Sequence, residues 1–250
     1  MRISELGKFE KYNQDLPDDL SDHPSMMSPV ERRVLYHYTK QTYSGHGKIV
    51  DAGVFLGAST RLFGHALLAN ADGPSLLKND KTPIVTFEHG KLGGGMPGFF
   101  ERHNIDVEGL IEGTSFAPLL MKMISDVLPM VDVRLGDILA QEWADQAIEI
   151  CFLDVIKSYE INTYVLQNFF PRLIPGKSLV VQQDYFIDRL PFLKLSQELL
   201  EPYFEYIGNA QSSGYFVLTK TIPRDVLDAA SDPASLPFDQ ALDLMDACGE

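Results

Sequence analysis

The segment KIVDAGVFLGAST, residues 48–60, constrains the fold of this chain more than any other stretch. A short apolar run reaches Asp51, glycines follow at positions 53 and 57, and a helical pattern then begins. Gly53 lets the backbone turn sharply and approach a ligand without a Cβ atom in the way, and Gly57 lets the next turn pack closely. In an open parallel sheet, ligands bind beyond the carboxyl ends of the strands. The segment is therefore either a ligand-binding turn or a plain connection from a strand to a helix.

The rest of the chain alternates short β-rich runs with helical stretches, which predicts βαβ units, an α/β fold and a mostly parallel sheet. A C-terminal antiparallel hairpin is expected in FEYIGNAQSSGYFVLTK, residues 204–220, around its Ser-Ser-Gly turn. Residues 70–83 are expected to form a loop insertion. The parallel strands are expected at residues 48–52, 84–88, 131–134, 149–155 and 177–184, and the main helices at residues 28–43, 59–70, 116–128, 159–170 and 191–204.

The pattern divides the chain into three parts. Residues 1–28 are polar and contain proline, so we expect a loosely docked N-terminal arm. Residues 29–222 carry the alternating elements and are expected to form the main domain. Residues 223–250 are expected to be an acidic tail with one amphipathic helix, Phe238–Ala247.

Composition narrows the class of partner. The 250 residues carry a formal net charge of −14, which disfavours nucleic acid and anionic lipid as partners. No apolar run approaches the roughly 18–20 residues needed to span a bilayer, and the polar N-terminal residues contain no apolar signal-peptide core. The only cysteines are Cys151 and Cys248, which makes a disulfide framework unlikely and favours a cytoplasmic location.

Two common nucleotide-binding motifs do not match the glycine turn. A dinucleotide fingerprint would read G-x-G-x-x-G, whereas this chain has G-x-x-x-G and lacks the third glycine. A P-loop would need Gly-Lys-Ser/Thr, which is also missing. An NAD(P)-dependent enzyme is therefore disfavoured.

Later segments of the chain carry a family resemblance. TFEHG, residues 86–90, ends a strand in an acidic residue, and GDI, residues 136–138, follows the third strand. Together with the glycine turn they resemble the motifs of class I S-adenosylmethionine-dependent methyltransferases. The block from Phe152 to Asp184 resembles the macrocin O-methyltransferase-like branch, whose type is a metal-dependent sugar O-methyltransferase. The resemblance covers residues 49–220, about two thirds of the chain, and implies a Rossmann-like methyltransferase fold with a seven-stranded sheet.

The resemblance implies a cofactor site for S-adenosylmethionine. The expected cofactor-binding residues are Asp51, Gly53, Gly57, Ser59, Glu88 and Asp137. The glycine turn and the following helix N-terminus would hold the methionine end, where N–H groups favour a carboxylate. Glu88 would accept hydrogen bonds from the ribose hydroxyls, or it is a solvated charge at a strand end. Asp137 would lie near the adenine amine, or it caps the helix that starts at Ile138.

Asp154 and Asp184 are the expected catalytic pair, because each closes one of two neighbouring strands and both should point into one cleft. Two carboxylates in one cleft repel each other unless a cation or a proton intervenes. In the resembling family such residues hold Mg²⁺, and Gln183 would be a third ligand through its amide oxygen. The metal match is incomplete, because the second Asp of the family's D-x-D is missing. Lys157, nearby, is an alternative partner for Asp154.

His89, beside the glycine-rich loop at residues 89–98, is a candidate general base or a solvent-facing loop residue. Its segment KLGGGMPG, residues 91–98, is a candidate lid over the cofactor or simply a mobile loop. The expected function is transfer of a methyl group from S-adenosylmethionine to an oxygen of a small or sugar-like acceptor. A non-catalytic cofactor-binding or accessory protein on the same scaffold is the alternative. Assembly into a homo-oligomer is left open.

Overall fold

A computed structural model describes residues 7–93, 96–106, 111–144 and 146–247 of the chain. In this part of the chain, one sheet has the strand order β3-β2-β1-β4-β5-β7-β6. The strands are β1 (Lys48–Ala52), β2 (Ile84–Glu88), β3 (Val131–Leu135), β4 (Ile148–Leu153), β5 (Leu179–Gln182), β6 (Phe204–Ala210) and β7 (Ser213–Leu218). The pairs from β3 to β5 are parallel, and β7 pairs antiparallel with both β5 and β6. The predicted α/β fold with a C-terminal hairpin is confirmed.

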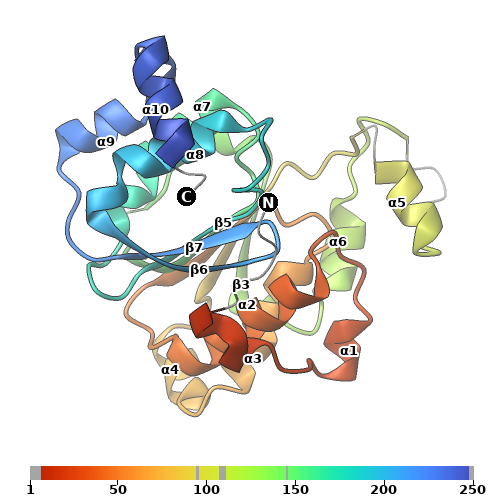
Figure 1. Cartoon of the computed structure of the whole chain (residues 1–250). Coiled ribbons are helices and arrows are strands. Elements are labelled where there is room, and N and C mark those ends of the chain that lie inside the picture. Colours follow the sequence, from red (N-terminus) through yellow and green to blue (C-terminus); the bar gives the residue numbers. More distant parts are fainter. Residues whose placement is uncertain (1–6, 94–95, 107–110, 145, 248–250) are drawn as a thin grey trace.

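Helices cover both faces of the sheet, as Figure 1 shows. The helices on one face include α2 and α3, and those on the other face include α7 and α8. Each face of the sheet has its own hydrophobic core: the first lies under α2 and α3, and the second lies under α7 and α8. Successive side chains of a strand point to opposite faces, so Ile49 packs in the first core and Val50 in the second. The helices are α1 (Asp18–Ser21), α2 (Pro29–Thr42), α3 (Ala58–Leu68), α4 (Gly73–Asn79), α5 (Met96–Arg102), α6 (Ala117–Met123), α7 (Tyr159–Asn168), α8 (Pro191–Leu199), α9 (Arg224–Ala230) and α10 (Phe238–Ala247).

The start of α2 follows its sequence signal. Ser28 accepts a hydrogen bond from the main-chain N–H of Glu31, and the Glu31 side chain accepts one from the N–H of Ser28. This capping box satisfies two N–H groups that a helix start otherwise leaves unpaired, and Pro29 at the first helical position needs no partner. None of the helices in the described residues is long and apolar enough to cross a bilayer.

The described part of the N-terminal arm packs into the core, which differs from the loose docking expected. The 3₁₀ helix η1 (Gly7–Tyr12) buries Phe9 to 1% exposure, and α1 buries Leu20 to the same degree. The rings of Phe9 and Tyr215 lie 4.6 Å apart, which joins the arm to β7. Three buried side chains, Phe9, Tyr12 and Leu20, anchor a stretch whose composition is mostly polar.

Several element boundaries differ from the expectations. The expected loop insertion contains α4, and the expected tail contains α9 as well as the predicted α10. Leu227 of α9 is buried against α7 and α8, so this part of the tail belongs to the second core. The hairpin turns at Gln211 and Ser212, one residue earlier than expected. The helices expected at residues 116–128 and 191–204 end early, at Met123 and Leu199.

Candidate active site

The carboxyl ends of β1, β2, β4 and β5 meet at the point where the strand order reverses, next to β1. The backbone continues the ladder one residue past each strand: Gly53 N donates to Phe87 O (2.9 Å) and Asp154 N to Ala52 O (2.8 Å). In an α/β sheet this is the position at which ligands bind. The structure therefore brings the glycine turn together with Glu88 at the end of β2 and Asp154 at the end of β4, as the sequence predicts.

Both glycines of the turn are required by geometry. Gly53 has φ +92°, and a Cβ atom there would lie 2.7 Å from the carbonyl carbon of Asp154. Gly57 has φ +83°, and a Cβ atom there would lie 2.0 Å from Cγ2 of Ile124. A side chain at either position would meet both backbone strain and a steric clash. In this conformation the close neighbour of each glycine is protein, not open space for a ligand.

Asp51 connects the turn to the start of α3. Its carboxylate is fully buried, and Oδ2 accepts hydrogen bonds from the hydroxyls of Ser59 (3.0 Å) and Thr60 (2.6 Å). Oδ1 has no hydrogen-bond partner among the described residues. Burial raises the pKa of Asp51 to about 7, against the opposing effect of the two hydroxyls. Sequence reasoning missed Thr60, although a hydroxyl one turn into the helix after an acidic strand residue is a readable signal.

Glu88 ends β2 and lies beside the glycine turn. One carboxylate oxygen accepts the N–H of Phe55 (2.6 Å) and the other accepts the N–H of Gly90 (3.0 Å). Each carboxylate oxygen has further lone-pair capacity, so Glu88 is able to accept hydrogen bonds from a ligand as well. Phe55 adopts φ +49°, a strained conformation for a residue with a side chain, and sequence reasoning gave it no role.

The crevice between these groups is narrow in this conformation. Its cavity of about 50 Å³ is far below the roughly 300–1,000 Å³ of typical ligand pockets. The glycine turn and Asp154 form one side of this cavity, and the segment Pro24–Met27 lines another side. A ligand of cofactor size therefore needs this segment to move. A larger cavity of about 130 Å³, between Phe170 and Leu227, lies at a distance from these residues.

Asp154 and Asp184 share one cationic partner. Nζ of Lys157 lies 2.7 Å from Oδ1 of Asp154 and 2.7 Å from Oδ2 of Asp184. Burial raises the pKa of Asp154 to about 6, with Lys157 opposing the shift. The two carboxylates come together as predicted, and the alternative partner named for Asp154 bridges both of them.

Gln183 does not join this pair. Its amide oxygen accepts a hydrogen bond from the hydroxyl of Ser213 on β7, and its NH₂ group donates to Ser212 at 3.4 Å. The Ser212 hydroxyl donates to Glu31 of α2, and the Ser213 hydroxyl oxygen lies 2.8 Å from the same Glu31 oxygen, so its one proton serves either Gln183 or Glu31. The expected third metal ligand therefore belongs to a network between β7 and α2.

His89 and Asp137 are both exposed at the same end of the sheet. Asp137 accepts a hydrogen bond from the N–H of Leu139 at 3.0 Å, so the helix-cap interpretation is confirmed. Its adenine role stays a prediction, as does the role of His89 as a base. Part of the candidate lid, residues 94–95, and the tail residue Cys248 lie outside the described residues, whereas Cys151 is a buried free thiol.

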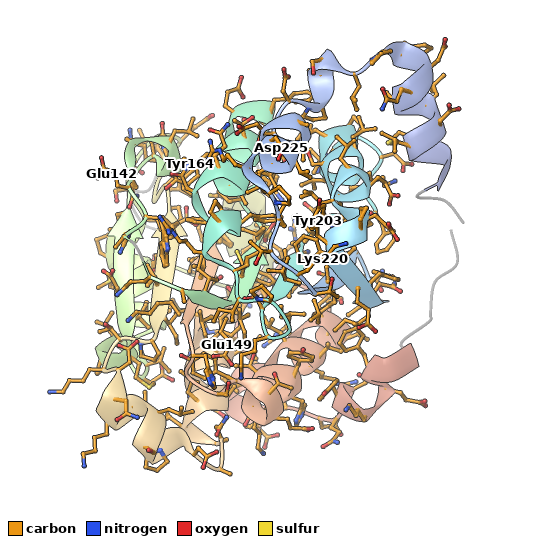
Figure 2. The ribbon with its side chains drawn as sticks, turned by 90° about the vertical axis from the view of Figure 1, so that its left-hand side faces the viewer. Glu142, Glu149, Tyr164, Tyr203, Lys220 and Asp225 are labelled. Atoms are coloured by element: carbon orange, nitrogen blue, oxygen red, sulfur yellow. The ribbon has the colours of Figure 1, made fainter. Side chains whose placement is uncertain are left out.

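Another buried carboxylate lies at the far end of the sheet. Glu149, in the lower part of Figure 2, is 4% exposed and sits near the start of β4. It accepts hydrogen bonds from the main-chain N–H groups of Ser44, His46 and Gly47 and from the Ser44 hydroxyl. These donors satisfy the charge and tie the loop after α2 to β4. Its distance from the strand ends gives it a structural role.

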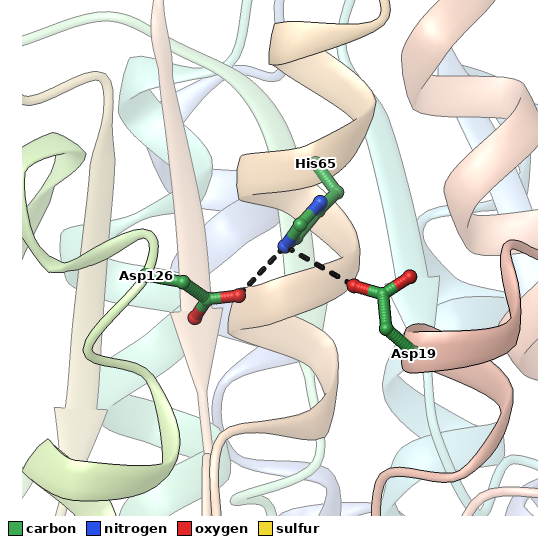
Figure 3. Close-up of side chains that lie close together, drawn as sticks. All are labelled: Asp19, His65 and Asp126. Carbon is green, nitrogen blue, oxygen red and sulfur yellow. Dashed lines mark hydrogen bonds and ion pairs between the residues drawn. The ribbon is translucent and has the colours of Figure 1, made fainter.

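Asp19, His65 and Asp126 form a cluster between α1, α3 and the segment after α6 (Figure 3). The His65 ring nitrogen lies 2.8 Å from Asp126 and 4.0 Å from Asp19. The guanidinium of Arg61 already supplies a cation here, with two nitrogens on Asp126 and one 3.5 Å from Asp19. The charge of the carboxylates is therefore compensated by protein, and the cluster fastens the arm to α3.

His23 extends this fastening to the glycine turn. One ring nitrogen lies 2.9 Å from the carbonyl oxygen of Leu56, and the other lies 3.1 Å from the Arg61 guanidinium. Because Pro24–Met27 follow directly, His23 fixes the segment that lines the crevice. Sequence reasoning missed this contact, since nothing in a polar arm indicates which residue meets the turn.

Comparison with known proteins identifies the class of fold. No protein-family model matches the chain, and no curated protein matches it in sequence. The structure is similar to that of the O-methyltransferase NovP, with 16% identity, a TM-score of 0.56, and coverage of 85% of this chain and 88% of NovP. It is also similar to an O-methyltransferase from Bacillus cereus in complex with SAH, with 16% identity, a TM-score of 0.50, and coverage of 88% and 92%. The fold is the Rossmann-like fold of class I methyltransferases.

Proposed function

We propose that the protein is an S-adenosylmethionine-dependent methyltransferase that acts on an oxygen of a small-molecule acceptor. One observation carries the proposal: the glycine turn and Asp154 border a single crevice at the switch point of a methyltransferase-type sheet, and Glu88 binds the N–H of Phe55, which lines that crevice. The complex of the B. cereus O-methyltransferase with SAH, on a similar fold, supports the choice of cofactor. The macrocin-like branch and a sugar-like acceptor remain parts of the proposal that rest on sequence resemblance.

The residues present fit an adenosyl cofactor in three places. Glu88 retains acceptor capacity for ribose hydroxyls. The N-terminus of α3, next to Gly57, favours a carboxylate such as that of the methionine end. The unpaired Oδ1 of Asp51 is a hydrogen-bond acceptor close behind the turn, which suits a nearby ammonium group. When bound, the cofactor supplies a methyl group on a sulfonium, which passes to the acceptor oxygen and leaves S-adenosylhomocysteine.

The chain's own residues would bind and orient the acceptor at the ends of β4 and β5. Asp154 borders the cavity next to Gly53, and its carboxylate is placed to accept a proton from an acceptor hydroxyl. Transfer requires the oxygen to be held in line with the methyl group, which is mainly a matter of positioning. Displacement of Pro24–Met27 would open the crevice, and its return would exclude water.

Calorimetric titration with S-adenosylhomocysteine tests the cofactor. We expect saturable binding and a raised melting temperature, and no effect of NADH. The variant Gly53→Val should abolish binding, whereas Gly113→Asn, at a glycine with open space around it and a positive φ that asparagine tolerates, should bind normally. Absence of heat and of a thermal shift at millimolar ligand would refute the proposal. Binding without methyl transfer to any phenol, catechol or sugar acceptor would instead favour the accessory-protein alternative.

Four other points remain proposals. A cytoplasmic location is consistent with the buried free thiol of Cys151, and a small molecule remains the proposed acceptor in place of nucleic acid. Division into an arm, a main domain and a tail is retained, with the arm and α9 packed onto the domain. Homo-oligomer formation remains a prediction for sedimentation analysis.

A further inference from the structure

We propose that the ammonium group of Lys157 takes the place of the divalent cation that the family resemblance implies, so that this site neutralises its carboxylates and binds its acceptor without a metal. The acceptor part of this inference rests on the proposed function. The cation part does not, because it concerns only the three side chains Asp154, Lys157 and Asp184.

The first argument is geometric. Lys157 lies three residues after Asp154, in the segment between β4 and α7, and its Nζ is 2.7 Å from one oxygen of each carboxylate. Distances of this size are those of charge-assisted hydrogen bonds. Its side chain is 46% exposed, whereas those of Asp154 and Asp184 are 30% and 18% exposed. The ammonium therefore lies between the carboxylates on their solvent side.

The second argument concerns the donor set. Mg²⁺ requires near-octahedral oxygen coordination at about 2.0–2.1 Å. The third expected ligand, Gln183, has its amide oxygen bonded to Ser213. Mg²⁺ would have to displace the Lys157 ammonium, which lies 2.7 Å from an oxygen of each carboxylate, so the residues as they lie do not fit the metal. The cation needed to hold two like charges in one cleft is already part of the chain.

The third argument is that the Lys157 ammonium retains one hydrogen-bond donor. A lysine has three N–H donors, and Asp154 and Asp184 engage two of them. Among the described residues, the third is left for the acceptor oxygen. There it would stabilise the negative charge that the acceptor oxygen gains as the hydroxyl proton passes to Asp154, and that charge would be consumed as the O–CH₃ bond forms and the S–CH₃ bond breaks. Lys157 would then do electrostatically what a bound cation does in a metal site.

Manganese binding, followed by electron paramagnetic resonance without cofactor or acceptor, tests the cation role. We expect no saturable site in the wild type at Mn²⁺ concentrations up to 1 mM, estimated as about the weak limit for carboxylate sites. The variant Lys157→Met should gain a Mn²⁺ site with a dissociation constant at least tenfold below that limit of about 1 mM. Adding Asp184→Asn to this variant should remove the site. Lys157→Arg keeps the charge and should gain none. Lys194→Met, which frees the single carboxylate of Asp188, is the matched control.

Two results would overturn the inference. One is a wild-type Mn²⁺ site that Asp154→Asn abolishes, and the other is a folded Lys157→Met protein that gains no site. If Lys157→Met does not fold, Lys157→Gln, which keeps a polar donor, serves in the same comparison. Once an acceptor is available, turnover should persist in EDTA, and a requirement for Mg²⁺ would also contradict the inference. Failure of the proposed function would appear separately, as absent S-adenosylhomocysteine binding.

Discussion

The carboxylate of Glu88 accepts a hydrogen bond of 2.6 Å from the main-chain N–H of Phe55, which joins the end of β2 to the glycine turn after β1. The ring of Phe55 packs against three further aromatic rings, those of Phe99, Phe100 and Phe116. The residue proposed to bind the cofactor ribose therefore also fixes the turn that borders the crevice. A change at Glu88 should affect ligand contacts and turn conformation together.

The variant Glu88→Gln should bind S-adenosylhomocysteine about 10–100-fold more weakly, because a hydrogen bond to a charged group contributes about 1.5–3 kcal/mol. Calorimetric titration measures the change. Glu201→Gln, at an exposed position in the 3₁₀ helix η5 (Glu201–Tyr203), is the matched control and should bind as the wild type does. Equal affinity of the two variants would contradict the role of Glu88.

Gly57→Ala should lower the free energy of unfolding by about 2–4 kcal/mol, since the new Cβ atom meets Ile124 and the positive φ is unfavourable. Gly98→Ala, on α5, is the comparison: its Cβ atom would meet only Arg102, at 3.5 Å. An alanine in a helix is favoured over glycine by up to ~1 kcal/mol, so Gly98→Ala should be neutral or stabilising. Chemical denaturation of both proteins checks the contrast, which equal stabilities would disprove.

Arg61→Ala should destabilise the protein by about 1–2 kcal/mol, because it removes a largely buried guanidinium that is hydrogen-bonded to Asp126, His23 and the Asp19 carbonyl, although both carboxylates stay partly solvated. The guanidinium holds the pKa of Asp126 down at about 2, although burial alone would raise it. Arg224→Ala removes an exposed ion pair with Asp228 and should cost less than about 0.5 kcal/mol. Denaturation midpoints measured at low and high salt would show the difference, and similar losses in both variants would count against a structural role for Arg61.

The buried His23 should make the protein sensitive to acid. Burial is the main cause that lowers its pKa to about 4, Arg61 and Arg32 lower it further, and the Leu56 carbonyl and Asp126 oppose the shift. In the unfolded chain its pKa is near 6.5, so between pH 6.5 and 4 only the unfolded state binds this proton. The stability that His23 contributes is therefore fully present above pH 6.5 and is lost as the pH falls through 4.

His23→Gln removes this titration while keeping a donor for the Leu56 carbonyl. Between pH 7 and pH 4, the wild type should lose up to about 3 kcal/mol more of its free energy of unfolding than the variant does. Urea denaturation at four or five pH values gives the two curves. Curves that stay parallel over this range would show that His23 does not titrate as the structure implies.

Much of the fold could be predicted from local sequence patterns. The bounds of β1, β2 and α10 agree with the expectations, because apolar runs and helical periodicity mark them clearly. Helix α4 was missed because a short GPSLLKN stretch begins with glycine and proline and resembles a loop. Helix α9 was missed because the burial of Leu227 depends on α7 and α8, which supply the surface that covers it and are distant in the sequence.

The site was predictable only where topology decides it. Strand order and strand ends bring Asp51, Glu88 and Asp154 to one edge of the sheet, and their sequence positions alone indicate this. The partners of individual side chains depend on tertiary contacts: Gln183 turns to Ser213, and Pro24–Met27 reach the crevice from far away in the sequence. Lys157 was recognised as a partner of Asp154, but its second bond, to Asp184, required coordinates.

The contact between Phe9 and Tyr215 limits the order in which tertiary contacts can form during folding. During synthesis, the first helices emerge with no β7 to pack against, because that strand is among the last elements made. Loop-closure entropy makes such distant pairings slow to form. The two ends of the segment over the crevice, at Phe9 and at Glu31, therefore gain these contacts only after β7 has been made, whereas the contacts of His23 with Leu56 and Arg61 can form earlier.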